Sequence, residues 1–313
     1  MLVGGLASLA TPGWAQGGFG AFVASVAAEA RREGIREGTI RAAFAGVGPN
    51  EHILELDRHQ PEFTMTWPEY LARVAPQSRI ETGRAVYGQV RPLLAEVRAQ
   101  YGVEPWVVMG IWGIESGFGQ KQGNYRVVEA LATLGFEGRR GSYFRGELIN
   151  ALRILEHGDV APDRMLGGYA GAMGQPQFMP SSYLRYAVDF DGDGRRDIWT
   201  SRADVFGSIA NYLARNGWQP GVPWGQPVRV PEDAGGLAGR ENARPLAEWA
   251  RLGVRRADGG GFERGEVRGA LVVPDGMPAG EGFMTYANFQ AIRRYNPSDF
   301  YALAVGTLGF ATT

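Results

Sequence analysis

The chain has 313 residues, of which 44% are hydrophobic and 21% are charged, and this composition is that of an ordinary globular protein. Its length favours a main domain with smaller appendages over one continuous core. The formal net charge of −1 excludes the broad basic surface with which proteins bind nucleic acid or an anionic membrane. Cysteine is absent, which excludes disulfides, a thiolate nucleophile and cysteine-ligated metals.

The first residues form an apolar run from Met1 to Ala10, and the next six, up to Gln16, are typical of a cleavage zone. Residues 1–16 are therefore interpreted as a signal-like leader, which predicts export to the periplasm without a lipid-modified cysteine. No basic segment precedes the run, which fits a truncated gene start. No segment approaches the roughly 20 apolar residues of a membrane span, so we expect a soluble mature protein. A leader-like tail on a cytoplasmic protein is the alternative.

Helical periodicity dominates the segment that follows, and residues 17–100 are predicted to form a helical domain. Apolar side chains recur there at helical spacing in two sets. The sets are Phe19, Phe22, Val23, Val26, Ala27 and Ala30, and Ala85, Val86, Val90, Leu93, Leu94 and Val97.

A more hydrophobic helix is predicted from Pro105, a residue that suits the first turn of a helix. The run that follows it is apolar on all sides up to Ile114, as expected for a helix buried at a domain centre. Another amphipathic helix, over 205–213, is closed by Asn216-Gly217, a typical left-handed stop.

The composition changes after Pro220. From there to about Gly282 the chain is rich in Gly and Pro, with short β-branched runs such as Val228–Val230 and Gly269–Val273. These runs predict a small insertion that contains strands. The remaining residues, 283–313, return to a dense aromatic and apolar pattern.

A single carboxylate, Glu115, stands near the end of the apolar helix, where helical spacing places Ile111, Trp112 and Phe118 beside it. Apolar surroundings disfavour the ionised form and suit a general acid that works near neutral pH. A buried glutamate paired with an arginine or with backbone donors would show the same pattern. Both interpretations stay open on the residues alone.

A second polar stretch, 168–183, mixes small residues with amides, hydroxyls and aromatic rings, among them Tyr169, Gln175 and Gln177. These are the groups that bind sugars, although a structural loop could carry them too.

Several stretches together resemble the membrane-bound lytic murein transglycosylase B family, and the resemblance runs from roughly Phe19 to Val305. They are Glu115–Gly119, Tyr169–Tyr183, the Asp-rich loop after it, and Asn211–Trp218. The resemblance implies a mainly α (α+β) fold, with a lysozyme-like α core, an N-terminal helical domain and a small β insertion. In this sequence the core would span 101–220, with the β domain at 221–282 and a return to the core at 283–313.

The resemblance also implies a reaction, the cleavage of the bond between N-acetylmuramic acid and N-acetylglucosamine without water. The muramoyl O6 hydroxyl attacks C1 and leaves a 1,6-anhydro ring. Glu115 matches the catalytic glutamate, which acts first as acid and then as base. This explains why no second carboxylate stands out, although most glycosidases use two. The O6 hydroxyl belongs to the same sugar ring as C1, and this proximity supplies much of the rate.

The same resemblance assigns residues that bind substrate. They are Tyr70, Ser116, Gln177, Tyr212, Tyr295, Asn296 and Tyr301. The sequence departs from the family at Phe118, where an aromatic with a hydroxyl is common.

The Asp-rich loop carries acids with the spacing of a calcium-binding EF-hand loop, and Gly194 stands at the sixth position. The spaced acids are Asp189, Asp191, Asp193 and Asp197. Arg195 would offer only its backbone carbonyl. Thr200 replaces the usual glutamate at the twelfth position, and the resemblance implies that Asp204 closes the site instead. A structural Ca²⁺ is the predicted cofactor, and a solvated loop without a cation is the alternative.

Three other functions stay open: a muramidase that uses water, a non-catalytic peptidoglycan-binding or scaffold protein, and a calcium sensor. The presence of Glu115 argues against the second, and a lone atypical loop argues against the third. The predicted partner is the peptidoglycan glycan strand, with proteins of cell-wall synthesis or division as further candidates. We expect a monomer that binds no nucleic acid and has no transmembrane segment.

Overall fold

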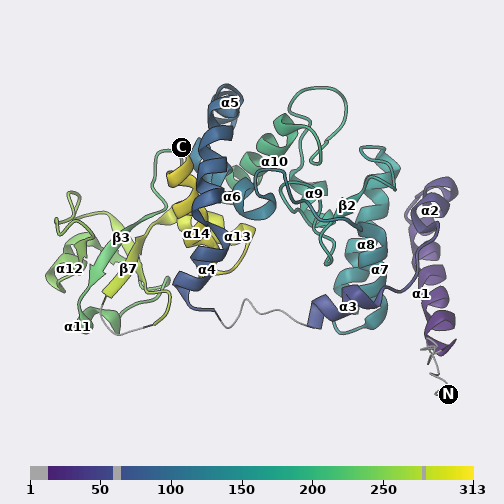
Figure 1. The fold of residues 1–313 in the computed structure, drawn as a ribbon, viewed down its shortest axis with the longest axis horizontal. Coiled ribbons are helices and arrows are strands. Elements are labelled where there is room, and N and C mark those ends of the chain that lie inside the picture. Colours follow the sequence, from purple (N-terminus) through teal and green to yellow (C-terminus); the bar gives the residue numbers. More distant parts are fainter. Residues whose placement is uncertain (1–12, 59–64, 277–279) are drawn as a thin grey trace, which may run out of the picture. The chain divides into compact units, whose positions relative to one another are not determined.

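The computed structural model describes residues 13–58, 65–276 and 280–313 (Figure 1). Most of the predicted leader, residues 1–16, lies outside the described residues. The chain divides into two compact units, one formed by residues 1–60 and 122–185 and the other by residues 61–121 and 186–313. The domain boundaries proposed from the sequence stay a prediction.

The first unit is an array of helices, with one short pair of strands. Its helices are α1 (Gly13–Arg32), α2 (Glu37–Phe44), α3 (Glu51–Arg58), α7 (Val127–Glu137) and α8 (Gly141–His157), with α9 (Pro180–Tyr186) at its end. The strands β1 (Tyr125–Arg126) and β2 (Leu166–Gly167) pair antiparallel. Helices α7 and α8 pack together, and α1 and α2 contact both of them (Figure 1).

The predicted apolar face of the first helix is confirmed in α1. Phe19, Val26 and Ala30 are buried, and the Phe19 ring meets the edge of Phe136 of α7 with the ring centroids 5.4 Å apart. Burial of large apolar side chains of this kind stabilises the unit by about 1.5–3 kcal/mol each.

Besides a small sheet and the two short helices that accompany it, the second unit has six helices among its described residues. The helices are α4 (Trp67–Val74), α5 (Gln77–Tyr101), α6 (Pro105–Ser116), α10 (Arg202–Arg215), α13 (Ala287–Tyr295) and α14 (Asp299–Thr312). The predicted helix that begins at Pro105 is thus confirmed as α6. The helix predicted over 205–213 is confirmed as α10, and Gly217 after it has a φ of 88°.

Helix α6 lies at the centre of this unit and packs closely along α14. A Cβ at Gly110 of α6 would lie 2.3 Å from the carbonyl oxygen of Val305, and a Cβ at Gly309 of α14 would lie 2.2 Å from that of Trp106. Only glycine therefore lets the two backbones approach this closely. The contact joins parts of the chain that are about 200 residues apart and brings the start of α14 to the end of α6.

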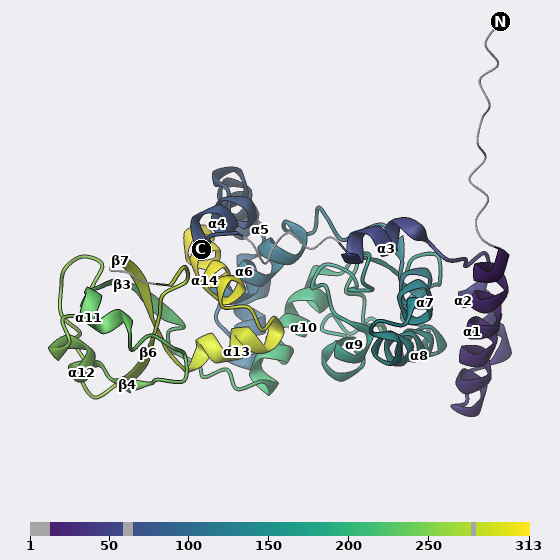
Figure 2. The same cartoon turned by 90° about the horizontal axis from the view of Figure 1, so that it is seen from below.

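The sheet has five strands in the order β4-β6-β7-β3-β5. They are β3 (Gly225–Val230), β4 (Arg244–Pro245), β5 (Arg255–Arg256), β6 (Arg268–Val272) and β7 (Gly280–Thr285), accompanied by the short helices α11 (Glu232–Gly235) and α12 (Leu246–Arg251). Figure 2 labels β3, β4, β6 and β7. Val228, Trp249 and Leu271 form its buried core. The predicted strands at 228–230 and 269–273 are confirmed, as is the mainly helical fold with a small β insertion.

None of the described helices is long and apolar enough to cross a membrane.

Candidate active site

Glu115 lies in the last turn of α6, half-buried, at the end of a helix whose residues are otherwise almost all buried. Gly117 ends the helix in the left-handed conformation, with a φ of 57°, and its N–H donates to the carbonyl of Gly113 over 3.0 Å. The stop fixes the backbone from which the Glu115 side chain projects.

The turn after Glu115 is held by Ser116, which is 1% exposed. Its hydroxyl donates to the carbonyl of Trp112 and accepts from the N–H of Gly119, each over 3.1 Å. Phe118, within this turn, has a φ of 61°, which is rare for a residue with a side chain and is stabilised here by burial against Trp112. These bonds give Ser116 a structural part, and its contact with substrate stays a prediction.

Tyr301 is the residue that the structure brings directly to the carboxylate. Its hydroxyl donates a hydrogen bond of 2.6 Å to Oε1 of Glu115. It stands in the first turn of α14, where its N–H donates to the hydroxyl of Ser298, the residue that caps the helix. The close packing of α14 on α6 therefore sets this hydrogen bond.

A row of tyrosine rings continues from this pair. Tyr295, the last residue of α13, is stacked on Tyr301 with the ring centroids 6.4 Å apart and the planes at 10°. Tyr212 of α10 lies 4.7 Å from Tyr295, and Tyr186 lies 4.5 Å from Tyr212. Three of these rings were predicted site residues. Tyr186 was missed, because nothing in the sequence near it marks it as part of the row.

Burial raises the pKa of both Tyr295 and Tyr301 well above the ordinary value of a tyrosine, and the nearby charge of Glu115 raises it further. Both phenols therefore stay protonated throughout the physiological range. A protonated Tyr301 is a permanent hydrogen-bond donor to the carboxylate.

An ion pair that the sequence did not reveal connects the two helices that carry these rings. Nε of Arg293 in α13 lies 2.5 Å from Oδ1 of Asp299 in α14, and both side chains are largely buried. Arg293 also donates to the carbonyl of Pro297 over 2.6 Å. Asn296, a predicted site residue, is exposed in the same turn and accepts from the N–H of Ser298 over 3.1 Å.

Tyr70, the predicted residue in α4, is buried in an aromatic cluster of the same unit. Its ring centroid lies 6.4 Å from that of Trp67 and 5.6 Å from that of Phe300. It is also among the groups that raise the pKa of Tyr301. The structure thus brings Tyr70, Tyr212, Tyr295 and Tyr301 into one region with Glu115.

Gln177, in contrast, belongs to the first unit. It has a φ of 50°, and its Nε2 donates to the carbonyl of Gln122 over 3.0 Å and to that of Gly174 over 2.7 Å. These bonds hold the amide in a half-buried, strained turn. Backbone strain of this kind is concentrated at functional sites, but the role of Gln177 stays a prediction.

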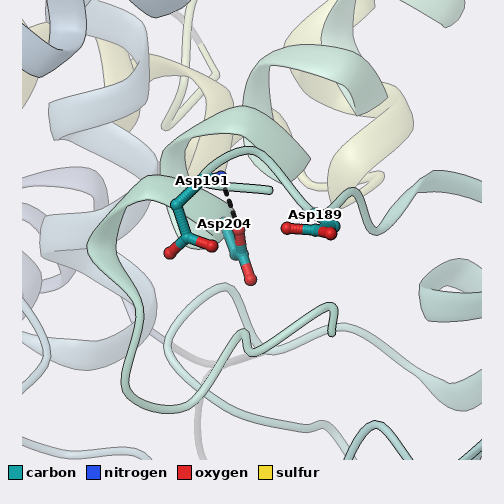
Figure 3. A group of neighbouring side chains, drawn as sticks. All are labelled: Asp189, Asp191 and Asp204. Carbon is teal, nitrogen blue, oxygen red and sulfur yellow. Dashed lines mark hydrogen bonds between the residues drawn. The ribbon is translucent and has the colours of Figure 1, made fainter. Parts of the chain in front are cut away.

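Three acids of the Asp-rich loop turn toward one another (Figure 3). Asp189, Asp191 and Asp204 each offer one carboxylate oxygen, and these oxygens lie within 4.8 Å of one another. Asp204, in the first turn of α10, is fully buried, and it accepts from the N–H groups of Phe190 and Asp197, each over 2.7 Å. The structure therefore brings together the two ends of the predicted metal loop.

The other predicted ligands bond locally. The carboxylate of Asp193 accepts from the guanidinium of Arg195 over 3.0 Å, and that of Asp197 accepts from the N–H groups of Trp199 and Thr200 over 2.9 Å. Their place around an ion stays a prediction.

Burial raises the pKa of Asp204 to about 6, and the negative charge of Asp191 adds to the effect, while backbone N–H bonds oppose it. A buried carboxylate next to another acid favours either a proton or a bound cation.

Proteins of known family match nearly the whole chain. Residues 18–310 match the model of the transglycosylase SLT domain. The membrane-bound lytic murein transglycosylase B of Escherichia coli (strain K12) is 34% identical, over 78% of this chain and 67% of that protein. The family resemblance predicted from the sequence is thus confirmed.

Solved structures agree with this match. SltB3 from Pseudomonas aeruginosa in complex with NAG-anhNAM-pentapeptide has a TM-score of 0.90 and 43% identity, over 94% of this chain and 79% of that chain. The Escherichia coli lytic transglycosylase Slt35 in complex with calcium has a TM-score of 0.78 and 30% identity, over 95% of this chain and 93% of that chain. The chain therefore belongs to the transglycosylase SLT domain family and is a lytic transglycosylase.

Proposed function

We propose that the protein cleaves the bond between N-acetylmuramic acid and N-acetylglucosamine in peptidoglycan without water and leaves 1,6-anhydromuramoyl ends. Glu115 acts first as acid and then as base. The observation that carries the proposal is the 2.6 Å hydrogen bond from Tyr301 to Oε1 of Glu115 at the end of the buried helix α6.

In the first step Glu115 donates its proton to the glycosidic oxygen, and the bond from that oxygen to muramoyl C1 breaks. In the second step the O6 hydroxyl of the same muramoyl ring attacks C1, and the Glu115 carboxylate accepts its proton. The residue returns to its starting state after each turnover. The Tyr301 hydroxyl can donate to Oε1 in both states and fixes the direction of the carboxyl group between the steps.

A single carboxylate suffices for this sequence because no water molecule has to be activated. The acid of α14, Asp299, supports this because it is already engaged in ion pairs. Asp299 is paired with Arg293 over 2.5 Å and with Arg240 over 3.3 Å, so it is a structural ion and not a second catalytic carboxylate.

We further propose that Asp189, Asp191 and Asp204 hold a structural Ca²⁺, with Asp193, the Arg195 carbonyl and Asp197 as further ligands. The fit rests on three oxygens within 4.8 Å of one another and on the burial of Asp204. Oxygen ligands with several negative charges are what this cation prefers. The ion would stabilise the loop that leads into α10, the helix that carries Tyr212.

The substrate implies that the protein works in the periplasm, on the glycan strands there. We also propose that the protein is a monomer and that proteins of cell-wall synthesis or division are among its partners.

Digestion of purified sacculi, followed by mass spectrometry of the products, tests the proposal. The wild type should release anhydromuropeptides, and Glu115→Gln, which keeps the shape of the side chain but cannot transfer a proton, should release almost none. Reducing ends in place of anhydro ends would identify a muramidase that uses water. Binding of sacculi with no product from the wild type would identify a non-catalytic protein.

A further inference from the structure

A pocket of about 440 Å³ opens beside the end of α6, within the second unit, and its charged lining residues are all cations. They are Arg73 at the end of α4, Arg79 at the start of α5, and Lys121 in the segment after α6. Among the residues that the structure describes, no acid lines the pocket. A concave surface with charges of one sign attracts ions of the opposite sign.

The carboxylates on α4 and at the start of α5, Glu69 and Glu81, bond to other groups. Oε2 of Glu69 in α4 accepts from the N–H and the hydroxyl of Thr66, over 2.8 and 2.9 Å. Oε1 of Glu81 in α5 accepts from the side-chain amide of Gln77 over 3.0 Å. Both carboxylates are therefore used to stabilise the beginnings of their own helices.

Arg79 is the most informative of the three cations. Its side chain is half-buried, and its guanidinium donates to the carbonyl of Val74. Within the part of the chain that the structure describes, neither Arg79 nor Lys121 has a carboxylate within ion-pair distance. Burial lowers the pKa of the Arg79 guanidinium. Half-burial leaves the guanidinium charge only partly solvated, and a bound anion would offset this cost.

The start of α5 adds to the positive electrostatic potential in the pocket. Pro76 caps this helix without a side-chain acceptor, and the first turn contains no acidic residue. Pro76 and Ser78 both line the pocket. The positive end of the helix dipole therefore points toward the same space as the cations.

The pocket also borders the candidate active site. Gly117, the residue that ends α6 two positions after Glu115, lines it, and a Cβ at Gly117 would meet nothing within 4 Å. An anionic group attached to a sugar at Glu115 could therefore reach the pocket. A peptide of five residues extends over about 17 Å, which is ample for this reach.

We propose that this pocket binds carboxylates of the peptide stem that the muramic acid of peptidoglycan carries, with Arg79 and Lys121 as the two cations that pair with them. The inference rests on the proposed function, since it takes the glycan to be the substrate. Arginine forms paired hydrogen bonds to a carboxylate, and lysine adds a point charge. Stem recognition would hold the adjoining muramoyl ring at Glu115.

The test uses two substrates: glycan strands with their stems and the same strands stripped of stems by an amidase. Arg79→Gln and Lys121→Gln should each lower kcat/KM on the stem-bearing strands about tenfold and leave the stripped strands unchanged. Arg79→Lys should recover part of the loss. Arg91→Gln is the matched control, because Arg91 is exposed on the same helix and lies outside the pocket. Equal effects on both substrates, or none, would overturn the proposal.

Binding is measured separately by calorimetry, so that the outcome does not depend on activity. The ligands are a muropeptide, its disaccharide without the stem, and inorganic phosphate. Arg79→Gln should weaken muropeptide binding about tenfold and leave the disaccharide unaffected. Phosphate binding as tight as that of the muropeptide would show a site for free anions and overturn the proposal. A wild type that cleaves neither strand but shows this binding pattern would contradict the proposed function alone.

Discussion

The Tyr301 hydroxyl donates to Oε1 of Glu115 over 2.6 Å, although the two residues are 186 positions apart in the chain. The bond exists because α14 packs along α6 through small residues and because Ser298 caps α14 just before Tyr301. The candidate acid is therefore oriented by a residue that belongs to a different helix.

Tyr301→Phe removes this hydrogen bond and keeps the ring. A hydrogen bond to a charged group contributes about 1.5–3 kcal/mol, so kcat/KM on sacculi should fall about 10- to 100-fold. The fold should survive, because the ring still packs. Tyr143→Phe, at a ring that is 48% exposed in the first unit, is the control and should leave kcat/KM unchanged. Wild-type activity in Tyr301→Phe would show that the bond does not orient Glu115.

The ion pair between Arg293 and Asp299 should hold the tyrosine pair in place. Asp299→Asn leaves the Arg293 guanidinium largely buried without its carboxylate, and we expect a loss of about 2 kcal/mol in the free energy of unfolding. Activity should fall as well, because Tyr295 and Tyr301 stand on the two helices that the pair joins.

Glu266→Gln is the control for this variant. It removes an arginine–carboxylate pair, with Arg264, whose side chains are 75% and 70% exposed, and it should cost less than about 1 kcal/mol. Urea unfolding monitored by circular dichroism measures both variants. Equal losses in the free energy of unfolding would show that the buried pair stabilises the fold no more than the exposed pair does.

Gly110 should be intolerant of any side chain. Gly110→Ala places a Cβ 2.3 Å from the Val305 carbonyl oxygen, and separating the backbones of α6 and α14 should cost about 3 kcal/mol. Gly88 is the matched control. It lies in α5 with nothing within 4 Å of an added Cβ, so Gly88→Ala should raise stability by about 0.5–1 kcal/mol. Thermal unfolding distinguishes the two, and a stable Gly110→Ala would contradict the close packing.

Calcium should stabilise the protein through the Asp-rich loop. Removal of the ion with a chelator should lower the Tm of the wild type, and added Ca²⁺ should restore it, because a ligand that binds only the folded state stabilises it. Asp204→Asn should abolish the response. Asp258→Asn, at an exposed acid far along the sequence, should retain it. The same Tm with and without Ca²⁺ would exclude the proposed site.

The stabilisation by calcium should depend on pH, through the ionisation of Asp204. The pKa of Asp204 is raised to about 6 in the folded protein, above the value of about 3.9 in an unfolded chain. Between these values the folded state retains a proton that the unfolded state has lost, so stability without calcium should fall as the pH rises from about 4 to about 6. Ca²⁺ binds the ionised carboxylate, so its increment in Tm should grow over the same interval. A constant increment from pH 4.5 to 7.5 would contradict this.

Local patterns were sufficient to predict much of the fold. The apolar run after Pro105, the stop at Gly217 and the β-branched runs near Val228 and Gly269 all depend on neighbours in sequence, and the structure confirms each of them. The candidate acid was also visible locally, as a carboxylate in an apolar helix, and the long motifs around it indicated the family.

Contacts between residues that are far apart in the sequence could not be predicted from local patterns. The pairing of Arg293 with Asp299 depends on the angle between two helices, which no local pattern specifies. Tyr186 was overlooked for a similar reason, since it joins the row of rings only through contact with Tyr212 of another helix. The pocket beside α6 likewise brings Lys121 to Arg73 and Arg79, which precede it by more than 40 residues.

The packing of α14 on α6 has a consequence for the biogenesis of the enzyme. Glu115 is synthesised about 190 residues before the ribosome reaches the glycines of α14, and a contact of such long range forms late in folding. A nascent or partly folded chain therefore contains the candidate acid without the hydrogen bond from Tyr301 that would orient it. An enzyme that cuts the wall of its own cell would in this way gain its activity only when the last helix has docked.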